Sequence, residues 1–366
     1  MAIPFNGQLK SNEIFAAIYN MIISQQVVSD NIPGLKKQGS LVEQARVDGT
    51  LYGDTKIYYF TDALKSVAWG GDSEAANLLQ LHRPDAPKTQ SITIDTFRMI
   101  PLTVDNYLSK RAFSTEGAFS EFTGVMLGWM RDTKKIYDTT LFNTFVGTNK
   151  GTGAAQNITV TLSTDTVGGV EATNRLNGQE IAETVANTIV AMEDIGRDFN
   201  DLGLLRAYDA DDFNFVWNAE YANKITKLDL PTIFHKDGLV DKLSQYTLPA
   251  RYFGAVNTAA GTAAASNSTV RSLYETDYTV GSTTTHVFPG DLVPNSAEYD
   301  ANETYTVDPK VICKIYHKNG VPFMSGFETG TEFFNPRSLT ETHYLIWGHN
   351  GLEALADKPF ITIEEA

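Results

Sequence analysis

Two extended segments with alternating hydrophobic and polar residues stand out in the first third of the chain. In the second segment, one face is apolar at a spacing of two residues and consists of Ile92, Ile94, Ile100, Leu102 and Val104. At about 3.3 Å per residue, residues 92–104 would reach roughly 40 Å, well beyond an average strand of about five or six residues. The segment 52–64 contains the β-favouring run 56–61 and is the expected partner strand.

A two-stranded ribbon is only marginally stable in water, so an arm of this length predicts a further surface on which it lies. We expect that surface on a neighbouring copy, and the alternative is a meander inside an ordinary α+β domain. The candidate residues for contact with a neighbouring copy are Lys56, Tyr58, Phe60, Trp69, Phe97 and Met99.

The next pattern has helical spacing and predicts one long helix over residues 114–146, about 45 Å in length. Apolar residues at steps of three and four form its expected packing face, which consists of Phe119, Phe122, Met126, Trp129, Ile136, Tyr137, Leu141 and Phe145. Arg131, Lys134 and Lys135 lie off this stripe and are expected to form a solvated face.

The middle of the chain alternates between helical and strand patterns. We expect a strand at 158–162, a helix beginning near Asn177, a buried strand at 202–208, and a helix capped by Asp211 that runs toward Ile225. The apolar face of the helix after Asn177 is expected to contain Ile181, Val185, Ile189 and Met192. This alternation predicts a compact α/β or α+β domain.

Residues 257–268 are mostly Ala, Gly, Thr and Ser, with almost nothing to bury, and are expected to form a surface loop or the edge of an insertion. Residues 270–308 remain polar and rich in Tyr and Thr. Strand character returns near the end of the chain, at 311–316, 344–347 and 360–363.

Composition is that of a globular protein, with 42% hydrophobic and 20% charged residues in 366. The 29 basic and 44 acidic side chains give a formal charge of −15. A surface that grips nucleic-acid phosphates needs a concentrated basic footprint, so this class of protein is not expected. An acidic protein can still enclose nucleic acid without holding it.

Candidate chemistry is sparse, and neither an enzyme nor a cofactor is predicted. The single cysteine, Cys313, excludes an intrachain disulfide and is expected to be a buried structural residue of a protein that folds in the cytosol. The six histidines show no spacing typical of a metal site. Phe323 stands where a nucleophile elbow before Ser325 would need glycine. There is no signal peptide and no apolar run of about 20 residues, so no membrane partner is expected.

The order of arm, long helix, compact domain and C-terminal strands resembles that of tailed-bacteriophage major capsid proteins with the Hong Kong 97-like fold. Four short stretches are also similar to phage capsid sequences: AIPFNGQLK at 2–10, RVDG at 46–49, YGDT at 52–55 and GWMR at 128–131.

The resemblance implies an α+β fold divided into an N-terminal arm, an extended β-hairpin loop, a peripheral domain with a spine helix, and an axial domain. The implied ranges are 1–48 for the arm, 49–112 for the loop, 113–175 with 335–366 for the peripheral domain, 114–146 for the spine helix, and 176–334 for the axial domain with an insertion at 256–308.

The resemblance implies hexamers and pentamers that close into an icosahedral shell around the double-stranded DNA genome of a tailed phage, with no sequence-specific DNA binding. Portal and scaffold proteins are implied partners, and decoration proteins are optional ones. Since no scaffold-like stretch precedes the arm, we expect scaffolding to be separate or dispensable. Assembly in the bacterial cytoplasm is implied. An encapsulin-type compartment shell and a soluble α+β enzyme are the alternatives.

Overall fold

The computed structural model describes residues 40–47, 53, 55–66, 81, 83–105, 116–164, 169–226, 244–266 and 268–366. Trp69, a candidate contact residue, lies outside this part of the chain. Among the described residues, no helix has both the length and the apolar character that crossing a membrane requires.

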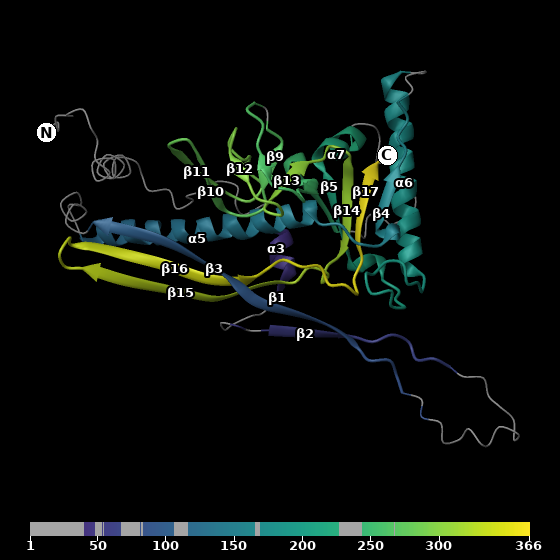
Figure 1. Ribbon diagram of the computed structural model, residues 1–366, viewed down its shortest axis with the longest axis horizontal. Helices are drawn as coiled ribbons and strands as arrows, with labels where there is room; N and C mark the ends of the chain where they lie inside the picture. The colour runs from purple at the N-terminus through teal and green to yellow at the C-terminus, as the bar shows by residue number, and fades with distance from the viewer. Residues whose placement is uncertain are drawn as a thin grey trace, which may run out of the picture.

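A long five-stranded sheet contains the extended segments (Figure 1). In spatial order its strands are β1 (Arg46–Val47), β15 (Phe323–Asn335), β16 (Thr340–Asn350), β3 (Lys88–Asp105) and β2 (Thr55–Phe60). β3 has 18 residues, which confirms the predicted long strand. β2 pairs antiparallel with only its first six residues, 88–93.

The rest of β3 pairs with β16 of the same chain, from Ile94 opposite Asn350 to Asp105 opposite Thr340. The surface that we expected from a neighbouring copy is therefore supplied, for residues 94–105 of the strand, by the β15–β16 hairpin. Sequence analysis missed β15, because Gly326 and Gly330 interrupt the alternating pattern that marks a strand.

The predicted long helix is present as α5 (Glu116–Thr148) and runs along the long sheet (Figure 1). Met126, Tyr137 and Leu141 are buried, as expected. Trp129 was expected on the packing face, but it is 53% exposed, and Met130 is buried instead. The side chains of Phe119 and Phe122 lie outside the described part.

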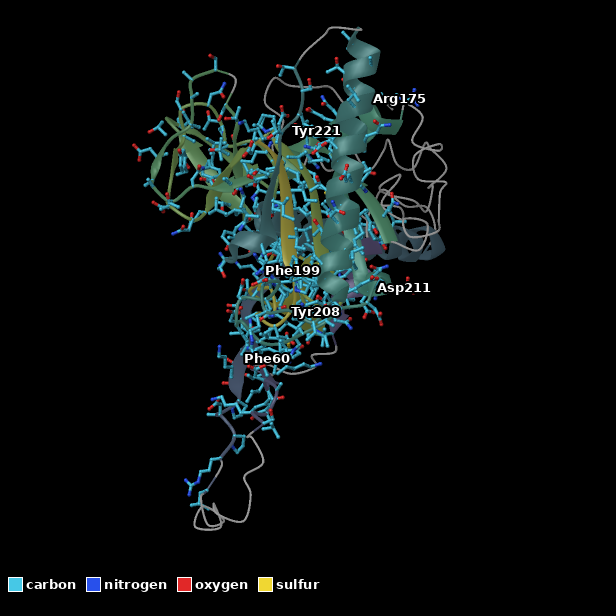
Figure 2. All side chains as sticks on the ribbon, turned by 90° about the vertical axis from the view of Figure 1, so that its right-hand side faces the viewer. Phe60, Arg175, Phe199, Tyr208, Asp211 and Tyr221 are labelled. Carbon is cyan, nitrogen blue, oxygen red and sulfur yellow. The ribbon has the colours of Figure 1, made fainter. Side chains whose placement is uncertain are left out.

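The second five-stranded sheet forms the core of the compact part of the molecule. In spatial order its strands are β4 (Asn157–Val160), β17 (Phe360–Glu365), β14 (Val311–His317), β5 (Phe213–Asn218) and β6 (Ser244–Leu248). All seven residues of β14 are buried. Figure 2 shows helix α6 (Val170–Glu193) lying across this sheet. The helix contributes its predicted face to the core, with Ile181, Val185, Ile189 and Met192 all buried.

Three expectations for this region were wrong in detail. Helix α6 begins at Val170, and Asn177 lies inside it. The side-chain oxygen of Asn177 accepts a hydrogen bond from the backbone N–H of Ser163, and its amide nitrogen donates one to the backbone carbonyl of Ser163. The segment 202–208 forms no strand, only an isolated bridge between Gly196 and Arg206.

The helix expected from Asp211 begins later than predicted. The aromatic-rich residues 213–218 form strand β5, and helix α7 (Ala219–Thr226) follows. Because β5 is buried on both faces, its apolar residues run almost continuously, and such a run does not distinguish a strand from a helix.

The polar region 257–308 is folded and contains small sheets that lie on the other side of α5 from the long sheet (Figure 1). Its strands, with the flanking β7, are β7 (Gly254–Val256), β8 (Gly261–Thr262), β9 (Val270–Ser272), β10 (Thr276–Val280), β11 (Thr283–Val287), β12 (Glu298–Tyr299) and β13 (Thr304–Val307). A separate small core holds them together and contains Tyr278, Val287 and Val293.

The remaining helical elements are short. They are α3 (Ser40–Ala45), η2 (Ala154–Gln156), η3 (Ala210–Asp212) and η4 (Ala250–Tyr252).

Candidate functional site

The arm, made of β2, the paired part of β3 and the connection between them, has an inner and an outer face. The strand register shows which side chains share a face, because Lys56 lies opposite Ile92 and Phe60 lies opposite Lys88. Phe60 is only 5% exposed and packs with Ile92 and Ile94 in the subunit's own core. It was a candidate for contact with a neighbour, and that prediction is wrong because its own chain covers it. Tyr58 shares this inner face and is half-buried.

The outer face carries large apolar side chains in solvent. Ile57 is 53% exposed and Tyr59 is 66% exposed, and farther along β3 the candidates Phe97 and Met99 are also exposed. Sequence analysis missed Ile57 and Tyr59, because both faces of β2 are rich in apolar residues and periodicity alone could not assign the outer one. Neighbouring exposed apolar residues, such as Ile57 and Tyr59 two positions apart on β2, are typical of an interaction surface.

Beyond β2 and β3, the described parts of the connection run away from the body of the molecule (Figure 1). All residues of 61–66 and 83–87 are exposed. Lys65 Nζ lies 3.2 Å from Asp85 Oδ2, so the two described segments of the connection are in side-chain contact at this point.

Hydrogen bonds at the base of the arm fix its direction. Arg197 Nη1 donates to Asp62 Oδ2 at 2.7 Å, and the backbone N–H of Leu205 donates to Asp62 Oδ1 at 3.1 Å. Arg206 also donates to the carbonyl of Thr61 at 2.8 Å. The Arg197 hydrogen bond, followed by that of Leu205, lowers the pKa of Asp62 to about 2. Figure 2 shows this end of the arm where it leaves the body, next to Phe60.

Replacing Asp62 with alanine is therefore expected to speed amide hydrogen exchange in β2 while leaving exchange in β14 unchanged. The same bonds give a pH dependence. Because the folded pKa is lowered from about 3.8, the contribution of Asp62 is complete above that value and is lost as the pH falls toward 2. Replacing Asp85, which is exposed on the connection, with asparagine is the matched control and should leave β2 unchanged. Identical amide exchange rates in β2 of all three proteins would contradict the idea that the hydrogen bonds of Asp62 hold the base of the arm.

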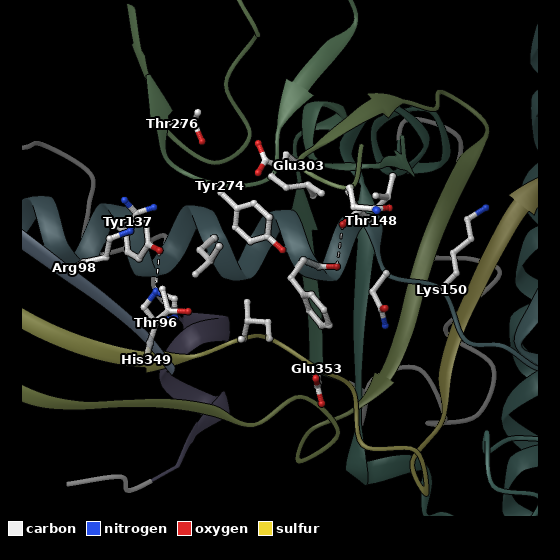
Figure 3. Close-up of a pocket in the computed structure, with 18 residues that line it drawn as sticks. Thr96, Arg98, Tyr137, Thr148, Lys150, Tyr274, Thr276, Glu303, His349 and Glu353 are labelled. Atoms are coloured by element: carbon white, nitrogen blue, oxygen red, sulfur yellow. Dashed lines mark hydrogen bonds between the residues drawn. The ribbon is translucent and has the colours of Figure 1, made fainter. Parts of the chain in front are cut away.

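A cleft of about 710 Å³ lies between β3, α5 and the segment around Tyr274 (Figure 3). The Tyr137 hydroxyl donates to His349 Nε2 at 2.8 Å, and His349 Nδ1 donates to the carbonyl of Asn350 at 2.9 Å. Burial raises the pKa of Tyr137 and lowers the pKa of His349, which keeps this pair neutral. Arg98 stacks over the Tyr137 ring at 5.2 Å.

Arg98 also donates to the carbonyl of Glu275 at 3.0 Å. The polar groups of the cleft thus connect β3, α5, β16 and the small sheets. Tyr137, His349 and Arg98 are engaged with one another or with backbone carbonyls, an arrangement that holds elements together rather than one that presents a nucleophile and a base to a substrate.

A cluster of charged side chains connects helix α5 with the long sheet. Lys134 Nζ is 3.3 Å from Asp138 Oδ2 and 3.5 Å from Glu328 Oε2, while Arg46 Nη2 is 3.5 Å from the same Asp138 oxygen. Lys134 is only 7% exposed, so the expectation that it lies on a solvated face was wrong. Its carboxylate partners explain the burial, since buried charges occur mainly in pairs. The group connects α5 with β1 and β15.

Cys313 lies in the core strand β14 and is fully buried, which confirms the expectation of a structural cysteine. Burial raises the pKa of its thiol to about 12, so the reactive thiolate is suppressed. Its neighbour Lys314 is also buried, and burial lowers the pKa of this amine to about 7. Lys314 Nζ donates to Asn149 O and Thr362 Oγ1, both at 2.8 Å.

The chain is similar to a known protein family and to solved structures. The family model described as "Phi29-like phage major capsid protein" matches residues 7–351. A search of curated proteins finds no match.

Solved structures share the fold. A chain from the capsid structure of Staphylococcus phage Andhra is 11% identical with a TM-score of 0.59, and the match covers 93% of this chain and 87% of that one. A chain from the structure of the head fiber and inner core protein gp22 of native bacteriophage P68 is 10% identical with a TM-score of 0.54, covering 87% and 82%.

The family match spans nearly the whole chain, and it favours a phage shell over a cellular compartment shell or an enzyme. The chain belongs to the Phi29-like phage major capsid protein family and is a structural, shell-forming protein of a tailed phage.

Proposed function

We propose that this capsid protein has the Hong Kong 97-like fold and assembles as hexamers and pentamers into an icosahedral shell around double-stranded DNA. The single observation that carries the assembly mechanism is the arm, whose exposed outer face includes Ile57 and Tyr59. An isolated subunit gains nothing from holding the apolar side chains of Ile57 and Tyr59 in water on the outer face of β2. A neighbouring subunit that covers them does gain stability.

The arm corresponds to the extended loop of the proposed fold, with a narrower range than 49–112. Residues 94–105 of β3 pair with β16, so they are part of the body. We place the extended loop at 49–93 and the spine helix at α5. The β15–β16 hairpin and the second half of β3 then complete the peripheral domain.

The axial domain is built on the sheet that contains β5 and β14. Strand β17, which we had expected to return to the peripheral domain, lies between β14 and β4 in this sheet. We therefore assign 360–365 to the axial domain, and the small sheets of 257–308 are its insertion.

Charge supports enclosure of DNA without gripping it. A formal charge of −15 gives a surface that repels phosphate, so DNA can pack inside the shell without being held at fixed positions. Scaffold and portal proteins, with optional decoration proteins, are the proposed partners, and assembly takes place in the cytoplasm of the bacterial host.

Shortening the arm tests this proposal. Residues 67–83 can be replaced by a short Gly-Ser linker, because the side chains of Lys65 and Asp85 are already in contact at 3.2 Å. We expect a folded subunit with unchanged circular dichroism and melting midpoint, but no closed shells in negative-stain electron microscopy. Replacing the same residues with a Gly-Ser linker of equal length separates the effect of arm length from that of side chains. Normal shells from both variants would show that neither the length nor the side chains of residues 67–83 are needed for assembly.

A further inference from the structure

A group of metal-ligating side chains lies on one face of the β15–β16 hairpin. Glu332 on β15 is directly opposite His343 on β16, and Glu341 precedes His343 by two positions. Direct cross-strand partners and residues two apart on a strand share one face of a sheet. One ligand atom from each residue lies within 4.8 Å of those of the other two.

The imidazole of His343 is the unusual member of this group. The residue is only 8% exposed, and its Nε2 is buried without a hydrogen-bond partner. Glu341 Oε1 is 3.8 Å from this nitrogen, which is too far for a hydrogen bond. A buried nitrogen left in this state is costly, and an ion between it and the carboxylates would supply the missing interaction.

We propose that Glu332, Glu341 and His343 bind a divalent transition-metal ion, with Zn²⁺ as the best fit. An imidazole nitrogen and carboxylate oxygens are ordinary Zn²⁺ ligands at about 2.0–2.2 Å, and water completes the coordination. Ca²⁺ takes about six to eight oxygen ligands and does not suit an imidazole. The ligand atoms already lie within 4.8 Å of one another, and the exposed side chain of Glu332 can rotate toward an ion.

A second histidine with two acidic neighbours provides a contrast within the same chain. His286 Nδ1 is 2.6 Å from Asp277 Oδ1, and its Nε2 is 2.8 Å from Glu275 Oε1. The hydrogen bond to Asp277, followed by that to Glu275, raises the pKa of His286 and so favours the protonated ring, whose two nitrogens both donate and have no lone pair for a metal. His286 is therefore the matched control for His343.

The proposed site has a structural consequence. On β16, His343 also pairs with Leu102 of β3, and Glu341 pairs with Val104. A bound ion would therefore connect β15 to β16 close to the end of the sheet where residues 102–105 of β3 pair with β16. The ion would stabilise this end of the long sheet.

The test uses the tag-free full chain, stripped with EDTA, dialysed and titrated with ZnCl₂ by calorimetry. We expect one Zn²⁺ per chain, and a melting midpoint raised by about 3 °C at one hundred times the dissociation constant. The Glu332→Gln variant, changed at an exposed position, should bind at least about tenfold more weakly. The His286→Gln variant should bind like the unmodified chain.

X-ray absorption on the Zn²⁺-loaded chain gives a readout that does not depend on folding of a variant. One imidazole nitrogen with oxygen ligands supports the site, whereas a sulfur ligand or several imidazoles would place the ion elsewhere. The proposal is overturned if the unmodified chain does not bind Zn²⁺, or if Glu332→Gln binds with unchanged affinity.

Discussion

Replacing Lys134 with methionine is expected to lower the free energy of unfolding by about 3 kcal/mol. The side chain is buried and pairs with Asp138, whose own side chain is only 1% exposed. Without the ammonium, the buried carboxylate of Asp138 loses its nearest cation, and Arg46 Nη2 remains 3.5 Å from it. Urea unfolding of the unassembled subunit, followed by circular dichroism, measures the change.

The pH dependence of the Lys134 variant distinguishes lost charge pairing from lost packing. Burial raises the pKa of Asp138, and the nearby charges of Lys134 and Arg46 oppose this effect. Removing Lys134 raises this pKa further. The difference in unfolding free energy between the original chain and the Lys134→Met variant should therefore narrow as the pH falls through the folded pKa of Asp138 in the variant. A gap independent of pH would contradict the electrostatic explanation.

Two further variants complete this test. Changing Asp138 to leucine together with Lys134→Met removes both charges, and stability should return to within about 1 kcal/mol of the original chain. Changing the adjacent Lys135 to methionine should alter stability by less than about 0.5 kcal/mol. If the double variant is less stable than Lys134→Met, the buried pair is not the cause.

Changing both Ile57 and Tyr59 to aspartate is expected to prevent assembly while the subunit still folds. Each side chain would contribute about 1.5–3 kcal/mol when a neighbour buries it, so losing both raises the concentration needed for assembly by at least about a hundredfold. Sedimentation velocity across a concentration series measures this shift. Both residues are more than half exposed in the subunit, so the melting midpoint should not change.

The matched control keeps the apolar surface. A variant with Ile57→Val and Tyr59→Phe should assemble at nearly the original concentration, because the buried apolar area is almost the same. Assembly of the aspartate variant at the original concentration would show that the outer face of the arm is not an interface.

Elements with strong local patterns were predictable from the sequence. The alternation from Ile92 to Val104 identified β3, and the helical spacing from Met126 to Leu141 identified α5. In both elements one face is buried along most of the length, which imposes a clear period on the sequence.

The errors arose where tertiary contacts decide the outcome. Both faces of β2 are apolar, so only pairing with β3 shows that Phe60 points inward and Tyr59 outward. Trp129 was expected to be buried and is exposed, and Lys134 was expected to be solvated and is buried. The burial of Lys134 could not be predicted from α5 alone, because one of its carboxylate partners, Glu328, lies on strand β15.

The proposed metal site was hidden for the same reason. Its residues come together only after the β15–β16 hairpin is known, and the weak strand pattern around Gly330 concealed that hairpin. Sequence spacing alone reveals a metal site when its ligands lie on one element, and here they come from two.

Cryo-electron microscopy of particles assembled from the purified chain, with its scaffold protein if one is needed, tests the central claim most directly. We expect closed icosahedral shells in which Ile57 and Tyr59 of each arm are buried against a neighbouring subunit. Shells in which this outer face stays in solvent, or a subunit that remains monomeric in the presence of a scaffold, would contradict it.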